Sequence, residues 1–254
     1  MSARIIPITA VLFAFATPSV AEIPAANVEP ALGMEPGAMQ PVMDQAIFAH
    51  AIFNELEGRW NGNNTQFRWD GQGWVGTDYD KLWIKSEGTL QSNGTLDDGQ
   101  QQFLYSRAIT TYFDLQGGLR SDLDSRPTRN WAALGIQGLA PYFFNLEITG
   151  FASGEGHLAA KLDASYDLLL TQRLILQPQM EFNIYSKADA ARLVGAGFSD
   201  IDTGLRLRYE FSRTFAPYLG VVYEGKFGQT ANFARQAGES TGDVRLVFGI
   251  RTWF

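Results

Sequence analysis

The stretch that decides the fold is the C-terminal one, Asp243–Phe254, which reads DVRLVFGIRTWF. From Val244 onward every second residue is apolar or threonine, whereas Arg245 and Arg251 stand among the residues between them. Because the side chains of a strand point alternately to its two faces, this pattern predicts a strand with one apolar face and one charged face. The alternation outlasts the roughly five or six residues of an average strand, so it favours a tilted strand that crosses a bilayer.

The same period of two recurs over much of the chain upstream. In residues 202–211, Leu205 and Leu207 share one face, and Arg206 and Arg208 share the other. The pattern alone permits two architectures, because a soluble barrel or sandwich keeps its apolar face inside, whereas a membrane barrel turns that face toward lipid. Further alternating segments lie at residues 142–151, 157–170, 173–185 and 215–226.

Residues 1–21 have the features of a cleavable signal peptide. Arg4 supplies a short positive region, Ile5–Ala16 is mainly apolar, and Ser19–Ala21 offers the small residues that a signal peptidase requires. We therefore predict export with cleavage after Ala21, and the alternative is a buried or interfacial helix. Residues 22–46 follow with four prolines and no periodic apolar pattern, which predicts a short, disordered periplasmic arm.

Composition narrows the class of protein further. After the N-terminus no run approaches the roughly 18–20 apolar residues of a membrane helix, which argues against a helical membrane protein. Aromatic residues make up 13% of the chain, as suits the two aromatic girdles of an outer-membrane barrel. The absence of cysteine excludes disulfides and thiolate metal sites. The net charge of −7 argues against a nucleic-acid partner.

Residues 47–254 are therefore predicted to form an all-β domain, a transmembrane antiparallel β-barrel of about 12 strands. Short connections such as residues 212–214 alternate with longer loops such as residues 228–242, as periplasmic turns alternate with external loops. An even strand number places both ends of the barrel in the periplasm. No sheet edge can stay unpaired in hydrocarbon, so residues 47–60 should pair with the last strand. The alternation is least clear between Gln102 and Arg120.

A membrane barrel turns its charged faces toward the lumen, where both signs of charge would then meet. Buried charges must be paired or hydrated, so one interpretation is that they form structural ion pairs that fill the lumen. The other interpretation is that acidic side chains line a path for cations. The carboxylates predicted to face the lumen are Glu55, Glu57, Asp70, Glu87, Glu147, Asp163 and Glu181.

The arm and the residues after it contain candidate metal ligands. Met34, Met39 and Met43 are three of the five methionines in the chain, and His50 follows them closely. Thioether sulfur is a soft ligand that suits Cu(I), and imidazole suits copper in either oxidation state. These four residues are therefore the predicted metal site, with a copper ion as its ligand.

Catalytic motifs are scarce, and we do not expect an enzyme. A barrel hydrolase of the lipase type would need a serine, a histidine and a carboxylate or amide in mutual reach. His157 does lie close in sequence to Ser153 and Glu155, but in a stretch, FASGEGH, that has the composition of a loop. The simpler interpretation is that His157 is a polar residue at a strand end.

Five segments of the chain carry a family resemblance: NELEGRW (54–60), RWDGQGWVGTDYDKLWIKSEG (68–88), GHLAAKLDASYDLLLTQRLILQPQMEFN (156–183), GLRLRYEFSRTFAPYLGV (204–221) and the closing RTWF. On these segments, from about Phe48 to Phe254, the chain resembles the copper resistance protein B family of outer-membrane barrels. The C-terminal Phe254 also resembles the signal that outer-membrane assembly machinery recognises.

The resemblance implies a Gram-negative outer-membrane protein of copper resistance and homeostasis that binds copper ions and passes them across the membrane. Its expected partners are copper ions, outer-membrane lipid and a periplasmic copper-handling protein. The family commonly carries a segment rich in His and Met near the N-terminus, whereas this chain keeps only Met34, Met39, Met43 and His50. Weak copper binding is therefore expected. A non-selective polar pore or structural barrel is the main alternative, and a barrel enzyme of the lipase type is the second.

Overall fold

A computed structural model of the protein describes residues 46–123 and 128–254. The predicted signal peptide and, apart from Ala46, the predicted arm lie outside the described residues, as do Met34, Met39 and Met43. The described part is built almost entirely of long strands, as the period of two predicts. Their bounds are β1 (Phe48–Trp60), β2 (Thr65–Gly76), β3 (Asp80–Gln91), β4 (Leu96–Ala108), β5 (Phe113–Asp122), β6 (Asn130–Ala140), β7 (Phe144–Ser153), β8 (Leu158–Tyr166), β9 (Leu168–Leu169), β10 (Leu174–Tyr185), β11 (Gly197–Tyr209), β12 (Phe215–Lys226) and β13 (Gly242–Trp253).

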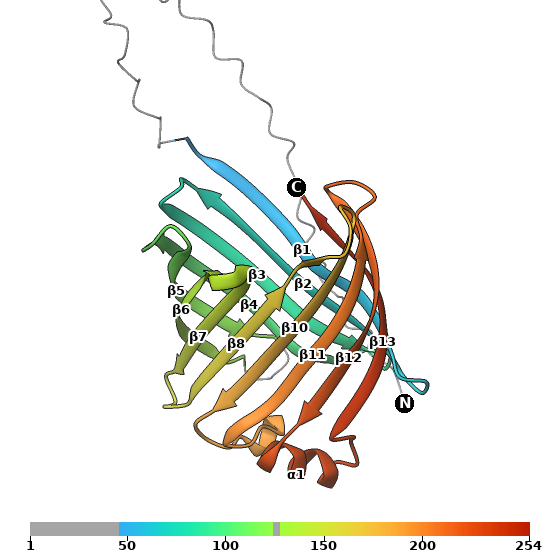
Figure 1. Ribbon diagram of the computed structural model, residues 1–254. Coiled ribbons are helices and arrows are strands. Elements are labelled where there is room, and N and C mark those ends of the chain that lie inside the picture. Colours follow the sequence, from blue (N-terminus) through green and yellow to red (C-terminus); the bar gives the residue numbers. More distant parts are fainter. Residues whose placement is uncertain (1–45, 124–127) are drawn as a thin grey trace, which may run out of the picture. The chain divides into compact units, whose positions relative to one another are not determined.

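The strands form one antiparallel ring in which each pairs with its neighbours along the chain (Figure 1). The short β9 continues β8 beyond an interruption at Asp167, and both pair with β10, so they make one strand of the ring. The ring therefore has twelve strands and is closed, as the sequence predicts.

The ring closes where the first strand meets the last. In the register of β1 and β13, Ile52 stands opposite Trp253 and Trp60 stands opposite Leu246. Beyond the ladder, the Ala51 and Phe254 backbones exchange two hydrogen bonds, at 3.0 and 2.8 Å. The predicted pairing of the first and last strands is thus confirmed, and the sheet has no free edge.

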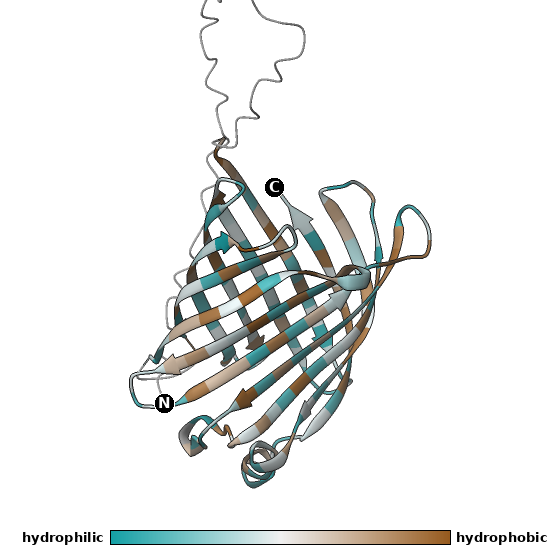
Figure 2. Cartoon of the chain, turned by 60° about the vertical axis from the view of Figure 1, so that its left-hand side comes forward, coloured by the Kyte–Doolittle hydropathy of each residue, from teal (hydrophilic) through white to brown (hydrophobic). Residues whose placement is uncertain are grey.

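The two faces of the wall are inverted relative to a soluble protein. On β13 the side chains of Val244, Leu246 and Phe248 are 61%, 52% and 56% exposed on the outer face, whereas Arg245 is only 5% exposed. Hydrophilic and hydrophobic residues alternate along the strands in Figure 2. An apolar exterior around a polar interior is the arrangement of a barrel surrounded by lipid, so it decides between the two architectures that the pattern permits.

The alternation predicted least clearly, between Gln102 and Arg120, has a physical cause. Leu104 on β4 points into the barrel and packs there with Trp131, Ala133 and Phe151 of β6 and β7, all of which are buried. Trp83 and Ala159 pack against this group. One sector of the interior is therefore apolar, and in that sector polarity no longer marks the inner face.

The two ends of the barrel differ. The end where β1 begins and β13 finishes, here called the terminal end, carries only short connections, including the 3-10 turn η1 (Pro141–Phe143). The opposite end, here called the loop end, carries the longer ones, with the 3-10 turn η2 (Ala190–Arg192) and the helix α1 (Gly228–Gln236) (Figure 1). The two longest connections, from β10 to β11 and from β12 to β13, lie at the loop end as predicted, but those after β1, β3 and β7 are as short as turns at the terminal end. No helix in the described ranges is long and apolar enough to cross a bilayer.

Candidate functional site

The charged lumen is built around Arg59 of β1. After a bulge between Phe53 and Glu55, alternate residues of β1 place Glu55, Glu57 and Arg59 on the inner face. The guanidinium of Arg59 donates to four carboxylates, which are Glu57 at 2.7 Å, Asp202 at 2.5 Å, Glu224 at 2.7 Å and Glu55 at 3.4 Å. One cation therefore joins the first strand of the barrel to β11 and β12.

A second arginine, Arg206 of β11, completes the pairing of the two glutamates. It lies 2.9 Å from a carboxylate oxygen of Glu57 and 3.0 Å from one of Glu55. The hydroxyl of Tyr218 donates a further hydrogen bond to Glu57, at 2.9 Å. Because Glu55 and Glu57 are almost completely removed from solvent, this multiple pairing offsets the cost of burying acidic groups inside the barrel.

Other ion pairs cross the lumen between distant parts of the wall. Arg68 of β2 bridges Glu55 and Glu181 of β10, at 3.1 Å to each. Lys161 of β8 contacts Glu87 of β3 at 2.5 Å and Glu181 at 3.3 Å. These strands lie far apart around the ring, so the side chains meet across the interior. The lumen is thus crossed by charge pairs, as in the first of the two predicted interpretations.

All seven predicted lumen carboxylates lie on the inner face, and five of them are in ion pairs. Glu147, the fifth, lies 2.8 Å from Lys85, whose ammonium also donates to two glutamine side chains. The other two differ, because within the described ranges no cation lies within ion-pair distance of Asp70 or Asp163. Among the described residues, Asp70 accepts a hydrogen bond only from the Asn54 amide, at 3.2 Å, and Asp163 accepts only a long one from the Gln179 amide, at 3.5 Å. Among the seven predicted carboxylates, these two have the most capacity for an incoming cation.

Of the four predicted metal ligands, only His50 lies within the described part of the chain. His50 lies on the inner face at the terminal end, where its ring centre is 5.5 Å from that of Trp253 and 6.3 Å from that of Trp74. Three arginines, Arg208, Arg213 and Arg251, share a small cavity with it. No group of three or more His, Asp or Glu residues in the described ranges is arranged to hold a metal ion.

The residues of the hydrolase alternative are near one another but are engaged elsewhere. His157 closes the turn between β7 and β8, where its carbonyl accepts the backbone N–H of Ser153. The Ser153 hydroxyl accepts the N–H of Glu155, and the Glu155 carboxylate pairs with Arg129 at 3.1 Å. Within the described residues, the His157 imidazole makes no hydrogen bond to Ser153, so this group does not have the geometry of a triad.

A third group of charges, at the loop end, has no counterpart in the sequence-based prediction. Asp122 of β5 accepts hydrogen bonds from Arg120, from the indole of Trp131 and from Arg192 of η2. Arg129 lies 2.9 Å from Asp189, which precedes η2. The connection between β10 and β11 therefore reaches over to β5 and β6 across the mouth of the barrel. The length of the β10–β11 connection was the only sequence signal for these contacts, because the residues that meet are far apart along the chain.

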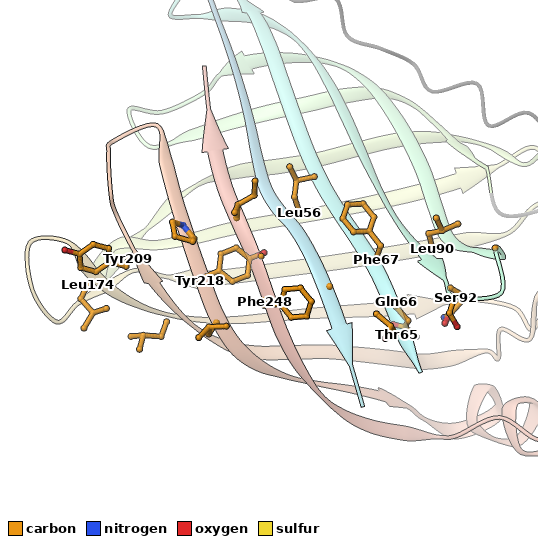
Figure 3. A pocket seen from close by; sticks show the side chains of 18 residues that line it. Leu56, Thr65, Gln66, Phe67, Leu90, Ser92, Leu174, Tyr209, Tyr218 and Phe248 are labelled. Atoms are coloured by element: carbon orange, nitrogen blue, oxygen red, sulfur yellow. The ribbon is translucent and has the colours of Figure 1, made fainter. Parts of the chain in front are cut away.

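A further concavity lies outside the lumen and is unrelated to these charges. It is a groove of about 1310 Å³ on the outer wall, lined mainly by apolar residues of β1–β3 and β10–β13. Figure 3 shows Leu56, Phe67 and Phe248 lining it side by side from adjacent strands. Gly58 lets the ring of Phe248 pack closely against β1, because the ring occupies the position that a side chain there would fill. Its apolar lining suits lipid chains and not ions.

Comparisons with known proteins agree with this architecture. The copper resistance protein B precursor (CopB) family model matches residues 47–254. Copper resistance protein B of Escherichia coli is 43% identical over 213 residues, which cover 84% of this chain and 72% of that protein. A copper resistance protein B homolog of Pseudomonas syringae pv. tomato is 41% identical over the same shares. The solved NanC porin superposes with a TM-score of 0.51 at 13% identity, covering 81% of this chain and 99% of NanC, which shows likeness of fold alone. The chain therefore belongs to the copper resistance protein B family.

Proposed function

We propose that this barrel resides in the outer membrane of a Gram-negative cell, binds copper ions weakly and passes them across that membrane. The observation that carries the proposal is a polar, carboxylate-rich lumen in a chain whose relatives at 41–43% identity are named for copper resistance. The terminal end faces the periplasm, since outer-membrane barrels place short turns on that side and long loops outside. Lipid covers the apolar wall.

Capture begins at the periplasmic side in this proposal. Met34, Met39 and Met43 bind the ion through sulfur, and His50 marks the point where the chain enters the barrel wall. A periplasmic copper-handling protein exchanges ions with this arm. The small number of soft ligands makes the binding weak and reversible, as a transfer step requires.

Inside the barrel, the carboxylates of Asp70 and Asp163 bind the passing cation transiently. Both lie on the inner face, and among the described residues neither has a cation within ion-pair distance, whereas the other five predicted lumen carboxylates already have such partners. Because ion pairs cross the lumen, a copper ion passes only when pairs such as Lys161–Glu87 open. This favours a narrow path over the alternative of an open, non-selective pore, and the protein acts as a carrier of ions without catalysis.

The test is copper flux into lipid vesicles that contain the purified barrel and a copper-sensitive dye. The double variant Asp70→Asn/Asp163→Asn should slow copper entry severalfold, whereas Glu239→Gln, an exposed carboxylate at the loop end, should not. Removal of residues 22–46 should weaken copper binding in solution. Equal entry of copper and a small neutral sugar, unchanged by the double variant, would favour the non-selective pore instead.

A further inference from the structure

A small cavity opens from the lumen at the terminal end, between β1, β11, β12 and β13. It has a volume of about 220 Å³. The cavity lies on the inner side of the wall, because the residues of β1 and β13 that line it belong to the face that points into the barrel. The lining side chains with polar or aromatic groups are His50, Arg208, Glu210, Arg213, Arg251 and Trp253.

The charge of this cavity is opposite to that expected of a cation site. Three guanidinium groups line it, against the single carboxylate of Glu210. A second carboxylate, Asp167, approaches Arg208 at 2.8 Å and Arg251 at 3.9 Å. Even with both acids charged, one positive charge remains in excess. A bare cation placed here would therefore be repelled, whereas a small anion would be attracted.

The donors of the cavity are also incompletely used. Each guanidinium carries five N–H donors in a planar fork. Arg208 donates to Gln177 and to Asp167, and a third group, its buried Nε–H, has no partner in the structure. Within the described part of the chain, Arg213 forms no ion pair, and its side chain is exposed at the turn before β12. Arginine forks match the two oxygens of a carboxylate or phosphate, so this is the class of ligand that the lining fits.

Hydrogen bonds from Trp253 hold the backbone of the turn at Arg213 and Thr214 against the cavity. The indole Nε1–H of Trp253 donates to the carbonyl of Arg213, and the Trp253 backbone N–H donates to the carbonyl of Thr214 at 3.2 Å. The ring of His50 lies against Trp253 on the other side.

We propose that this cavity is a binding site for a small dissolved oxyanion, a carboxylate or phosphate, and that Arg208, Arg213 and Arg251 hold it beside His50. The ligand enters from the lumen, because Arg208 and Arg251 lie on the inner face. The proposal does not rest on copper transport, and its failure would leave that function untouched. It also gives His50 a surrounding in which a copper ion would need an anionic co-ligand.

The experiment uses the purified mature protein in a neutral detergent without copper. Inorganic phosphate, and acetate in a parallel series, are titrated at constant ionic strength set with chloride, and tryptophan fluorescence is recorded. Phosphate should give a saturable change, because Trp253 lines the cavity. Arg213→Gln should weaken the apparent affinity about tenfold, the factor expected for one charge-assisted hydrogen bond. The matched control, Arg235→Gln, removes an exposed arginine of α1 at the other end of the barrel.

Arg213 is exposed, so its replacement should leave the fold intact, as gel mobility before and after boiling will verify. Saturation by acetate as well would assign the site to oxyanions in general, and saturation by phosphate alone to phosphate. The proposal is overturned by a fluorescence change that rises linearly with both anions. It is equally overturned if Arg213→Gln and Arg235→Gln titrate as the wild type does.

Discussion

Arg59→Met is expected to destabilise the barrel by about 3 kcal/mol, the lower part of the range for breaking a buried ion pair. Arg59 is 1% exposed and has four carboxylate partners. Its replacement does not leave all four without a cation. Glu55 and Glu57 keep Arg206, and Glu224 keeps Arg245. Asp202 has no second cation within ion-pair distance in the described part of the chain.

The magnitude therefore depends on one orphaned carboxylate. The Asp202 side chain is 20% exposed, so water offsets part of the cost of leaving it unpaired, and this places the estimate at the lower end. The double variant Arg59→Met/Asp202→Asn should recover most of the loss, because it removes the uncompensated charge. Arg59→Lys keeps the charge and should fall between wild type and Arg59→Met.

The assay is equilibrium unfolding in urea from lipid vesicles, followed by tryptophan fluorescence and by gel mobility of unboiled samples. The reasoning is refuted if Arg59→Met unfolds within about 0.5 kcal/mol of wild type, the range of ordinary surface substitutions. It is also refuted if the double variant is no more stable than the single one. Either result would mean that the lumen is hydrated enough to screen these charges.

Three further predictions concern the wall, the mouth and the arm. Leu246→Arg places a charge on the lipid-facing side of β13 and should cost about 2–4 kcal/mol if the residue lies near the bilayer midplane, as urea unfolding would measure; Leu246→Val serves as its control, and equal stability of the two would contradict an outer lipid face there. Arg192→Ala removes a contact that holds the β10–β11 connection across the loop end, so conductance in planar bilayers should rise, and unchanged conductance would mean that this connection does not limit passage. Removal of residues 22–46 should weaken copper binding in a calorimetric titration without altering gel mobility, and an unchanged titration would exclude the arm as the site of capture.

The sequence predicts the wall of the barrel better than its interior. Each strand face needs only local alternation, so Val244 and Arg245 can be assigned to opposite faces from their neighbours alone. Even so, the bulge between Phe53 and Glu55 changes which residues of β1 face inward, so His50 and Glu57 share the inner face although one is even-numbered and the other odd. Leu104 shows a second limit, because an apolar residue inside the lumen looks like one on the lipid side.

The candidate site was predictable as a set of residues but not as a set of contacts. The seven lumen carboxylates follow from strand alternation, and all of them lie inside. Their partners do not follow, because the pairing of Arg68 with Glu181 depends on which strands stand opposite each other across the ring. The three arginines around His50 come from β11, β13 and the turn before β12, and no local pattern connects them to β1.

The seam between β1 and β13 has a consequence for the order of assembly. The strand made first finds one of its two ladder partners only in the strand made last, and Arg59 finds Asp202 and Glu224 only in β11 and β12. Contacts of such long sequence separation form slowly, because most of the chain must be in place before they offset the entropy of closure. A nascent or truncated chain therefore carries an open edge and unneutralised charge on its first strand. Pairing of β1 with β13 removes the open edge, and the approach of β11 and β12 neutralises Arg59, so the first strand is completed only when the last strands are in place.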